Sequence, residues 1–157
     1  MALSQEDIDR YARQIIVPGI GARGQQRLCE TTVGVFGRPP GRARLEVYLK
    51  AAGFRTADVT SEEVALLAAA DPDAVPAGVP ARPTAWYRVG RGRLRGGVAP
   101  TPRAALEAAG PALASVHGDS LSAALACVGA CDAATTLVGL ALGWIDAGHP
   151  AAWELPL

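Results

Sequence analysis

The chain has 157 residues, and 50% of them are hydrophobic, which is enough apolar material for one compact domain with its own core. Aromatic residues make up only 5% of the chain, so the core must be built mainly from alanine, leucine and valine. Lysine plus arginine and aspartate plus glutamate both number 15, and the resulting net charge of zero argues against a dedicated nucleic-acid-binding or membrane-surface protein.

The N-terminal segment is predicted to form two helices. The first covers about 4–17, where Ser4 and Asp7 have the spacing of a capping box and isoleucines recur at helical intervals. Arg13 lies near the polar side of this amphipathic helix. A second, short helix is expected over about 22–30.

A βαβ unit follows. The pattern predicts a strand over 32–37, a helix over 41–53 that ends at Gly53, and a second strand over 54–59. We expect a further helix at 62–70, in the sequence EEVALLAAA, capped by the preceding threonine and serine.

The second half of the chain begins after a linker at 71–83, which carries four prolines. A hairpin is predicted over 84–100 and a short helix over 102–110. A long apolar helix is then expected from Asp119 or Ser120 to about residue 148, with a break near one of its glycines. We interpret it as a soluble core helix and not a membrane span, because it contains Asp132 and is rich in Ala, Gly, Ser and Thr. The organisation is one domain, 1–157, made of parts 1–70 and 84–157.

The β-strand at 32–37 leads into the sequence GRPPGR, where a phosphate-binding loop would be expected in this kind of unit. Gly37 permits a tight turn, but Pro39 and Pro40 remove two backbone donors, and Arg42 occupies a position where glycine would allow close packing. The loop therefore lacks the usual means of holding phosphate. Three arginine side chains could hold an anion instead, although at a helix start such residues are more often solvated: Arg38, Arg42 and Arg44.

Other candidate polar groups carry little signal. No acid is well placed to bind a ribose about 20 residues after the loop, since Asp58 comes too early, and Glu62 and Glu63 suit the start of a helix. His117 and His149 have no partner in a recognisable nucleophile motif.

The three cysteines are Cys29, Cys127 and Cys131, and they form neither an even disulfide set nor a Cys-x-x-Cys pair. Cys127 and Cys131 share one helical face, but two thiols do not complete a zinc site, so we interpret them as core residues. The N-terminus lacks the profile of a signal peptide. We therefore expect a cytoplasmic protein with no metal site.

The N-terminal sequence LSQEDIDRYARQIIVPGIGARGQQRL, followed by VGVFG and YLKAAGFRT, resembles the N-terminus of ThiF, MoeB and HesA proteins, bacterial relatives of ubiquitin-activating enzymes. The sequence VGACDAATTLVGLALG resembles the long helix that closes their nucleotide-binding half. The resemblance implies a Rossmann-like, doubly wound α/β sheet with helices on both faces, and a dimer. It also implies adenylation of the C-terminal glycine of a ubiquitin-like sulfur carrier with ATP and magnesium.

The chain departs from this family in several places. The family's glycine loop, G-x-G-G-x-G, keeps only its first glycine in the corresponding residues, which are Gly37, Arg38, Pro39, Pro40, Gly41 and Arg42. The ribose-binding acid is replaced at about Ser61, and the magnesium-binding aspartate and the catalytic cysteine loop are not found in the sequence. The second arginine of the R-Y-x-R-Q motif, which in the family reaches the partner's ATP phosphates, is conserved as Arg13. Without that role, Arg13 would pair with a neighbouring carboxylate.

We therefore expect a shortened ThiF/MoeB-like pseudoenzyme, with no cofactor, that acts as a homodimer or with a full-length ThiF/MoeB-like enzyme or a ubiquitin-like sulfur carrier. It would supply Arg13 in trans to an active partner. One alternative is a reduced adenylyltransferase that binds ATP and magnesium through the arginines around Gly41. Another is a small-ligand-binding protein with a pocket near Gly37, in the crevice where open α/β sheets bind ligands.

Overall fold

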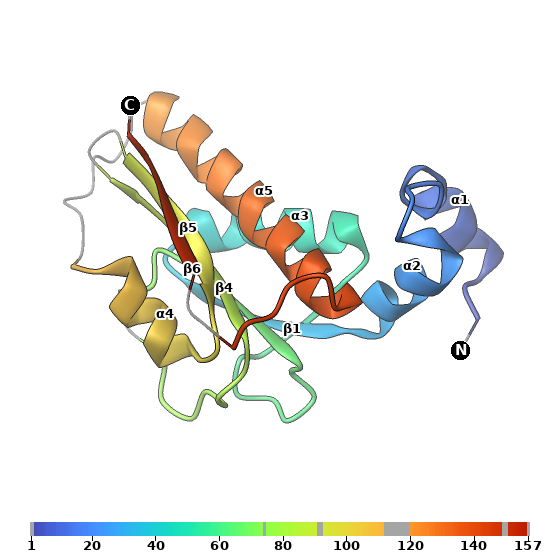
Figure 1. Cartoon of the computed structure of the whole chain (residues 1–157), viewed down its shortest axis with the longest axis horizontal. Helices are drawn as coiled ribbons and strands as arrows, with labels where there is room; N and C mark the ends of the chain where they lie inside the picture. Colours follow the sequence, from blue (N-terminus) through green and yellow to red (C-terminus); the bar gives the residue numbers. More distant parts are fainter. Residues whose placement is uncertain (1, 74, 91–92, 112–119, 149–150, 157) are drawn as a thin grey trace.

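The computed structural model describes residues 2–73, 75–90, 93–111, 120–148 and 151–156 (Figure 1). In these residues a six-stranded sheet forms the centre, in the order β2-β1-β3-β4-β5-β6. Its strands are β1 (Thr32–Gly37), β2 (Arg55–Ala57), β3 (Leu66–Ala70), β4 (Thr84–Gly90), β5 (Arg93–Ala99) and β6 (Ala151–Pro156). β1 to β4 are parallel, and β5 is antiparallel to both of its neighbours. The predicted α/β class is confirmed.

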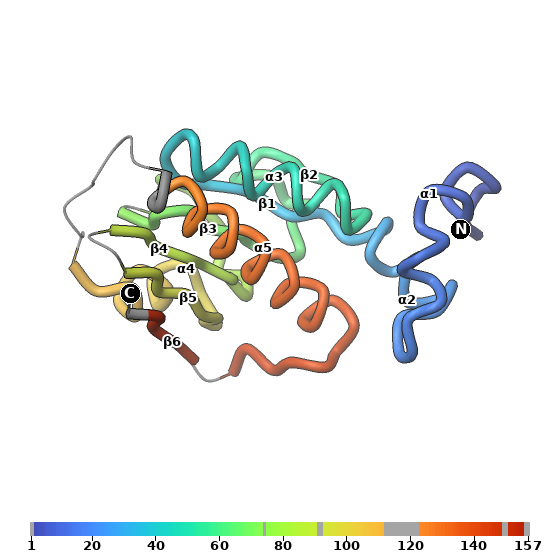
Figure 2. The backbone as a smooth tube through the Cα atoms, turned by 90° about the horizontal axis from the view of Figure 1, so that it is seen from above, coloured from blue at the N-terminus to red at the C-terminus, as the bar shows by residue number. Residues whose placement is uncertain are grey.

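Helices cover both faces of the sheet. On one face, α3 (Gly41–Ala52) and α5 (Ser120–Leu142) pack side by side, and their leucines and alanines join Val33, Val35 and Tyr87 in one core cluster (Figure 2). On the other face, α4 (Pro102–Ala109) covers a smaller cluster around Trp86. Alanines at several of these positions let the helices approach the sheet closely.

The helix termini follow the signals in the sequence. In α1 (Gln5–Ile15), the hydroxyl of Ser4 accepts a hydrogen bond from the Asp7 amide, and the Asp7 carboxylate accepts one from the Ser4 amide, which completes the capping box. At the end of α3, Gly53 has a left-handed φ of 103°, a conformation that favours glycine. Both predictions are confirmed.

The two N-terminal helices project from one end of the sheet (Figures 1 and 2). They are α1 and α2 (Gly21–Glu30), and we call them the arm. The arm is attached at the C-terminal end of α3. There the side-chain amide of Gln14 donates to the backbone carbonyl of Ala51 at 2.8 Å, and the side-chain amide of Gln25 donates to that of Ala52 at 3.0 Å. The arm therefore lies a full helix length away from the loop that begins α3.

The predicted helix at 62–70 is wrong, because Leu66–Ala70 form the buried strand β3 between β1 and β4. A parallel strand that is covered on both faces is apolar throughout, and this run of alanine and leucine is indistinguishable by periodicity from a short buried helix. Residues 71–83, predicted as a linker, connect β3 to β4 within the sheet, and their described part holds neither helix nor strand.

The long helix α5 differs from its prediction in two ways. It continues without a break through Gly129 and Gly139, and it ends at Leu142, before the predicted end near residue 148. Its segment Ala123–Leu142 is long and apolar enough to cross a membrane by composition, but half of that segment is buried within this fold. The strand β6, which lies on the edge of the sheet beyond β5, was not predicted.

Candidate functional site

The loop between β1 and α3 lies at the carboxyl end of β1, where the chain turns back through α3 to β2 while β3 lies on the other side of β1. In open α/β sheets, ligands bind at such a point. Gly37 ends β1 with a φ of 123°, and a Cβ atom built on it would lie 1.7 Å from the carbonyl oxygen of Ala70. The close approach of two strands therefore requires this glycine, whether or not a ligand binds.

The start of α3 offers few donors to an anion. Pro39 and Pro40 have no amide hydrogen, and the N-cap, Pro40, provides no side-chain cap. The amide of Arg42 donates to the carbonyl of Arg38 at 3.1 Å, and the amide of Arg44 donates to that of Pro40 at 3.2 Å. These two amides are used inside the chain and are not available to an anion.

Two of the three loop arginines are paired with carboxylates. Arg38 contacts Asp73 with an N···O distance of 2.7 Å, and Arg42 contacts Glu46 one helical turn later at 3.0 Å. The side chains of Arg38 and Arg42 are 68% and 49% exposed. An anion that used either arginine would compete with a carboxylate of the same chain.

Two aspartates after β3 are part of this site and were not predicted from the sequence. Asp71 has a φ of 51°, and its carboxylate accepts a hydrogen bond of 2.9 Å from the amide of Val89. Burial raises the pKa of Asp71 above its ordinary value, and the hydrogen bond from Val89 offsets only part of that rise. Asp73 follows two residues later. The signal was the sequence DPD directly after a buried strand, and it was lost because that strand was taken for a helix.

Arg88 lies beneath these aspartates and is almost fully buried, with 2% of its side chain exposed. Its guanidinium donates to the carbonyls of Pro72 at 2.7 Å and of Gly110, and it lies 3.5 Å from Asp73. Its Nε atom has no partner among the described residues. Arg88 therefore joins the C-terminal end of α4 to the β3–β4 connection and places a buried positive charge under the loop.

Tyr87, on β4, holds the first turn of α3. Its hydroxyl donates to the carbonyl of Gly41 at 3.0 Å. A Cβ atom built on Gly41 would lie 2.9 Å from the Tyr87 hydroxyl oxygen. Burial raises the pKa of Tyr87, so its hydroxyl stays protonated and remains a donor. Gly37 and Gly41, which the sequence assigned to a degenerate nucleotide loop, are thus both required by packing.

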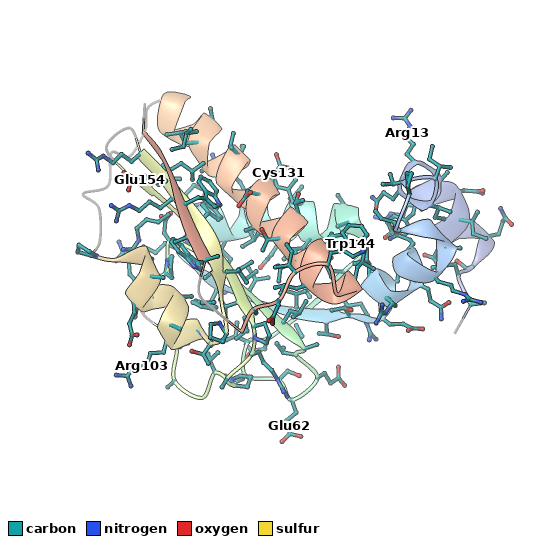
Figure 3. All side chains as sticks on the ribbon, in the orientation of Figure 1. Arg13, Glu62, Arg103, Cys131, Trp144 and Glu154 are labelled. Carbon is teal, nitrogen blue, oxygen red and sulfur yellow. The ribbon has the colours of Figure 1, made fainter. Side chains whose placement is uncertain are left out.

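Arg13 lies elsewhere, on the exposed side of α1, and points away from the rest of the chain (Figure 3). It makes no ion pair within the part of the chain that the structure describes. The described structure therefore does not bring Arg13 together with the loop residues.

A groove of about 270 Å³ lies between the arm, α3 and α5. Its walls are mostly apolar and include Gln14, Tyr48 and Cys131. It does not include Gly37, where the small-ligand alternative expects a pocket. Cys127 is half-buried, but Cys131 is exposed, so the prediction that both are core residues is wrong for Cys131. Because α5 is apolar on all sides, its sequence does not show which side faces the core, and Cys131 lies on the exposed side.

The remaining candidates do not add to the site. No group of three metal-ligating side chains occurs in the part of the chain that is described. His117 and His149, and Asp119 as one predicted start of the long helix, lie outside the described residues. Glu62 and Glu63 precede β3 and do not begin a helix.

Comparisons with known proteins agree with the N-terminal resemblance. Over 63 residues, the chain is 40% identical to the probable adenylyltransferase/sulfurtransferase MoeZ of Mycobacterium tuberculosis, a match that covers 40% of this chain and 16% of MoeZ. Over 52 residues, it is 46% identical to the adenylyltransferase and sulfurtransferase MOCS3 of Bos taurus, covering 33% of this chain and 11% of MOCS3. The matches thus span less than a fifth of the length of these relatives. No family model matches the chain.

Similar folds occur among solved structures. The crystal structure of PaaA superposes with a TM-score of 0.66 at 12% sequence identity, over 99% of this chain and 72% of PaaA. A heterocyclase solved with substrate and cofactor gives a TM-score of 0.54 at 14% identity, over 90% of this chain and 22% of the heterocyclase. At these identities, the likeness concerns the fold alone. The sequence matches, by themselves, support a ThiF/MoeB-like family over about 40% of this chain.

Proposed function

We propose that this chain is a non-catalytic ThiF/MoeB-like interaction subunit, which forms a homodimer or pairs with an active adenylating enzyme and supplies Arg13 to that partner's nucleotide. The single observation that carries the proposal is the state of the β1–α3 loop. Pro39 and Pro40 remove donors, and Arg38 and Arg42 are engaged by carboxylates of the same chain. This loop therefore offers fewer backbone amides to ATP phosphates than a glycine-rich loop does.

The position of the arm supports a role in trans. α1 is attached to the C-terminal end of α3 through Gln14 and Ala51, whereas the loop lies at the other end of that helix. A helix of 12 residues is about 18 Å long. Arg13 is exposed and points away from the sheet, so it does not approach a phosphate held at the β1–α3 loop of its own chain.

An arginine is suited to this role. Its guanidinium stays charged at any physiological pH and presents several donors in a plane that matches phosphate oxygens. Placed against a partner's ATP, it would add positive charge where negative charge develops during adenylation. A ubiquitin-like sulfur carrier, whose C-terminal glycine the partner would adenylate, is the third member of the proposed system. The proposal needs no cofactor in this chain itself and fits a cytoplasmic protein.

The test is ATP–pyrophosphate exchange by an active ThiF/MoeB-like enzyme from the same organism, with its carrier, in the presence and absence of this chain. We expect the wild-type chain to raise the exchange rate and Arg13→Ala to lose that gain, with an effect on the order of 10²-fold as for one transition-state donor. Arg23→Ala, which removes an exposed arginine from the neighbouring α2, is the matched control and should behave as wild type. Exchange catalysed by this chain and carrier alone would contradict the proposal.

A further inference from the structure

Asp73 is held between two arginines that come from different parts of the fold. Arg38 of the β1–α3 loop approaches it at 2.7 Å, and Arg88 of β4 approaches its other oxygen at 3.5 Å. The Asp73 side chain is 23% exposed, so this carboxylate lies at the mouth of the site and not in the core. A single internal anion thus bridges the loop and the sheet.

The buried guanidinium of Arg88 favours a negative charge at the position of the Asp73 carboxylate. It is buried, with 2% of its side chain exposed, and most of its donors go to neutral carbonyl oxygens such as those of Pro72 and Gly110. Its Nε has no partner in the described ranges. A buried guanidinium is costly unless an anion compensates it, and Asp73 is the carboxylate that contacts it.

The start of α3 adds to the same field. The helix begins at Gly41, and a Cβ on this residue would lie 3.6 Å from a carboxylate oxygen of Asp71. The N-terminus of a helix favours negative charge, and here the chain itself provides it. Both carboxylates come from the short sequence DPD, which follows β3.

We infer that Asp73 is the residue that keeps anionic ligands away from the β1–α3 loop, because its carboxylate lies between Arg38 and Arg88, where a phosphate or carboxylate group would otherwise bind. This inference rests on the proposed function in one respect, namely that the wild-type chain holds no nucleotide. A free anion must displace a carboxylate that is tethered to the same chain and therefore competes at a high effective concentration. Removal of the Asp73 charge frees the exposed Arg38 from its carboxylate and leaves the buried charge of Arg88 without an anion beside it.

The test compares two substitutions that make the same change in net charge. Asp73→Asn removes the carboxylate and keeps its size, whereas Glu62→Gln removes a carboxylate from an exposed position before β3 (Figure 3). Each purified chain is titrated calorimetrically with inorganic pyrophosphate. We expect Asp73→Asn to bind at least about tenfold more tightly than wild type, as charge-assisted contacts become available, and Glu62→Gln to match wild type.

The double variant Arg38→Ala/Asp73→Asn should lose the gained affinity, because one of the two arginines is gone. Asp73→Glu, which keeps the charge, should bind pyrophosphate no better than wild type. If Asp73→Asn does not fold, as judged by its thermal unfolding, Asp73→Ala is the second variant without the charge. The inference is overturned if a folded variant without the charge binds pyrophosphate no more tightly than Glu62→Gln. Tight Mg-ATP binding by the wild-type chain would instead overturn the proposed function.

Discussion

The hydroxyl of Tyr87 on β4 donates a hydrogen bond of 3.0 Å to the carbonyl oxygen of Gly41 in the first turn of α3. These residues are 46 positions apart in the sequence, and the Tyr87 side chain is fully buried. The bond fixes the helix start against the sheet. The turn that would face a nucleotide is therefore positioned by the protein's own packing.

Tyr87→Phe removes this hydrogen bond and leaves the ring in place. We expect the free energy of unfolding to fall by about 1 kcal/mol, the usual contribution of a buried hydrogen bond. Urea denaturation measures the change. Tyr48→Phe is the control, because the hydroxyl of the half-buried Tyr48 makes no hydrogen bond within the described residues. Equal losses in the two variants would contradict the role of Tyr87.

Gly37→Ala places a Cβ atom 1.7 Å from the carbonyl oxygen of Ala70, at a φ of 123°. The strands must separate to accommodate it, and we expect a loss of about 3 kcal/mol or more in the free energy of unfolding. In Gly21→Ala, the backbone φ is 59° and no atom lies within 4 Å, so only the strain of a left-handed conformation remains, about 1 kcal/mol. Similar losses for both variants would show that β1 and β3 are not so closely packed.

Arg88→Met removes the buried guanidinium and leaves the carbonyls of Pro72 and Gly110 without their donor. We expect destabilisation of about 3 kcal/mol, typical of a broken buried ionic network. Arg103→Met removes an arginine of α4 whose side chain is 87% exposed, and it should change stability by less than about 0.5 kcal/mol. Thermal unfolding at one pH gives both values. If Arg88→Met left the free energy of unfolding nearly unchanged, water would have replaced the contacts of the guanidinium, which would contradict this prediction.

Asp132, on α5, predicts a pH dependence. Burial raises the pKa of its carboxyl above the ordinary value of 3.8, and a hydrogen bond from Trp153 lowers it by less. The folded chain therefore binds more protons than the unfolded chain above pH 3.8, and this group makes the fold less stable as the pH rises through its folded pKa.

Asp132→Asn removes this effect and keeps an acceptor for the Trp153 indole. We expect the variant to be more stable than wild type at pH 7, and the difference to disappear as the pH falls below 3.8. Unfolding curves measured across this range test the sign. A wild-type chain that gains stability relative to the variant at higher pH would contradict the buried state of Asp132.

Local signals in the sequence predicted the elements whose ends they specify. The capping box at Ser4 and Asp7 and the left-handed glycine at Gly53 both occur where expected, and α4 begins at Pro102, the predicted start. The strand β3 was missed because alanine and leucine in a strand buried on both faces show no alternation. β6 was missed because its sequence, AAWELP, ends in a proline and is short, so only pairing with β5 defines it.

The candidate site was predicted in part. The prolines of the loop were evident from the sequence, because their loss of amide donors is a local property. The pairs Arg38–Asp73 and Tyr87–Gly41 depend on which strands are neighbours, and that order follows from the assignment of β3. A helix at 62–70 would not lie beside β1, so the predicted elements gave no reason to expect Asp73 next to Arg38.

The proposed function requires that this chain has lost nucleotide binding at the β1–α3 loop. The most direct measurement is a calorimetric titration of Mg-ATP into the purified wild-type chain, with an active ThiF/MoeB-like enzyme as the positive control. We expect no saturable heat for this chain, because Pro39 and Pro40 lack amide donors and Asp73 engages Arg38. Saturable binding at micromolar ATP that is lost in Arg38→Ala or Arg42→Ala would contradict it and identify a site rebuilt from arginine side chains.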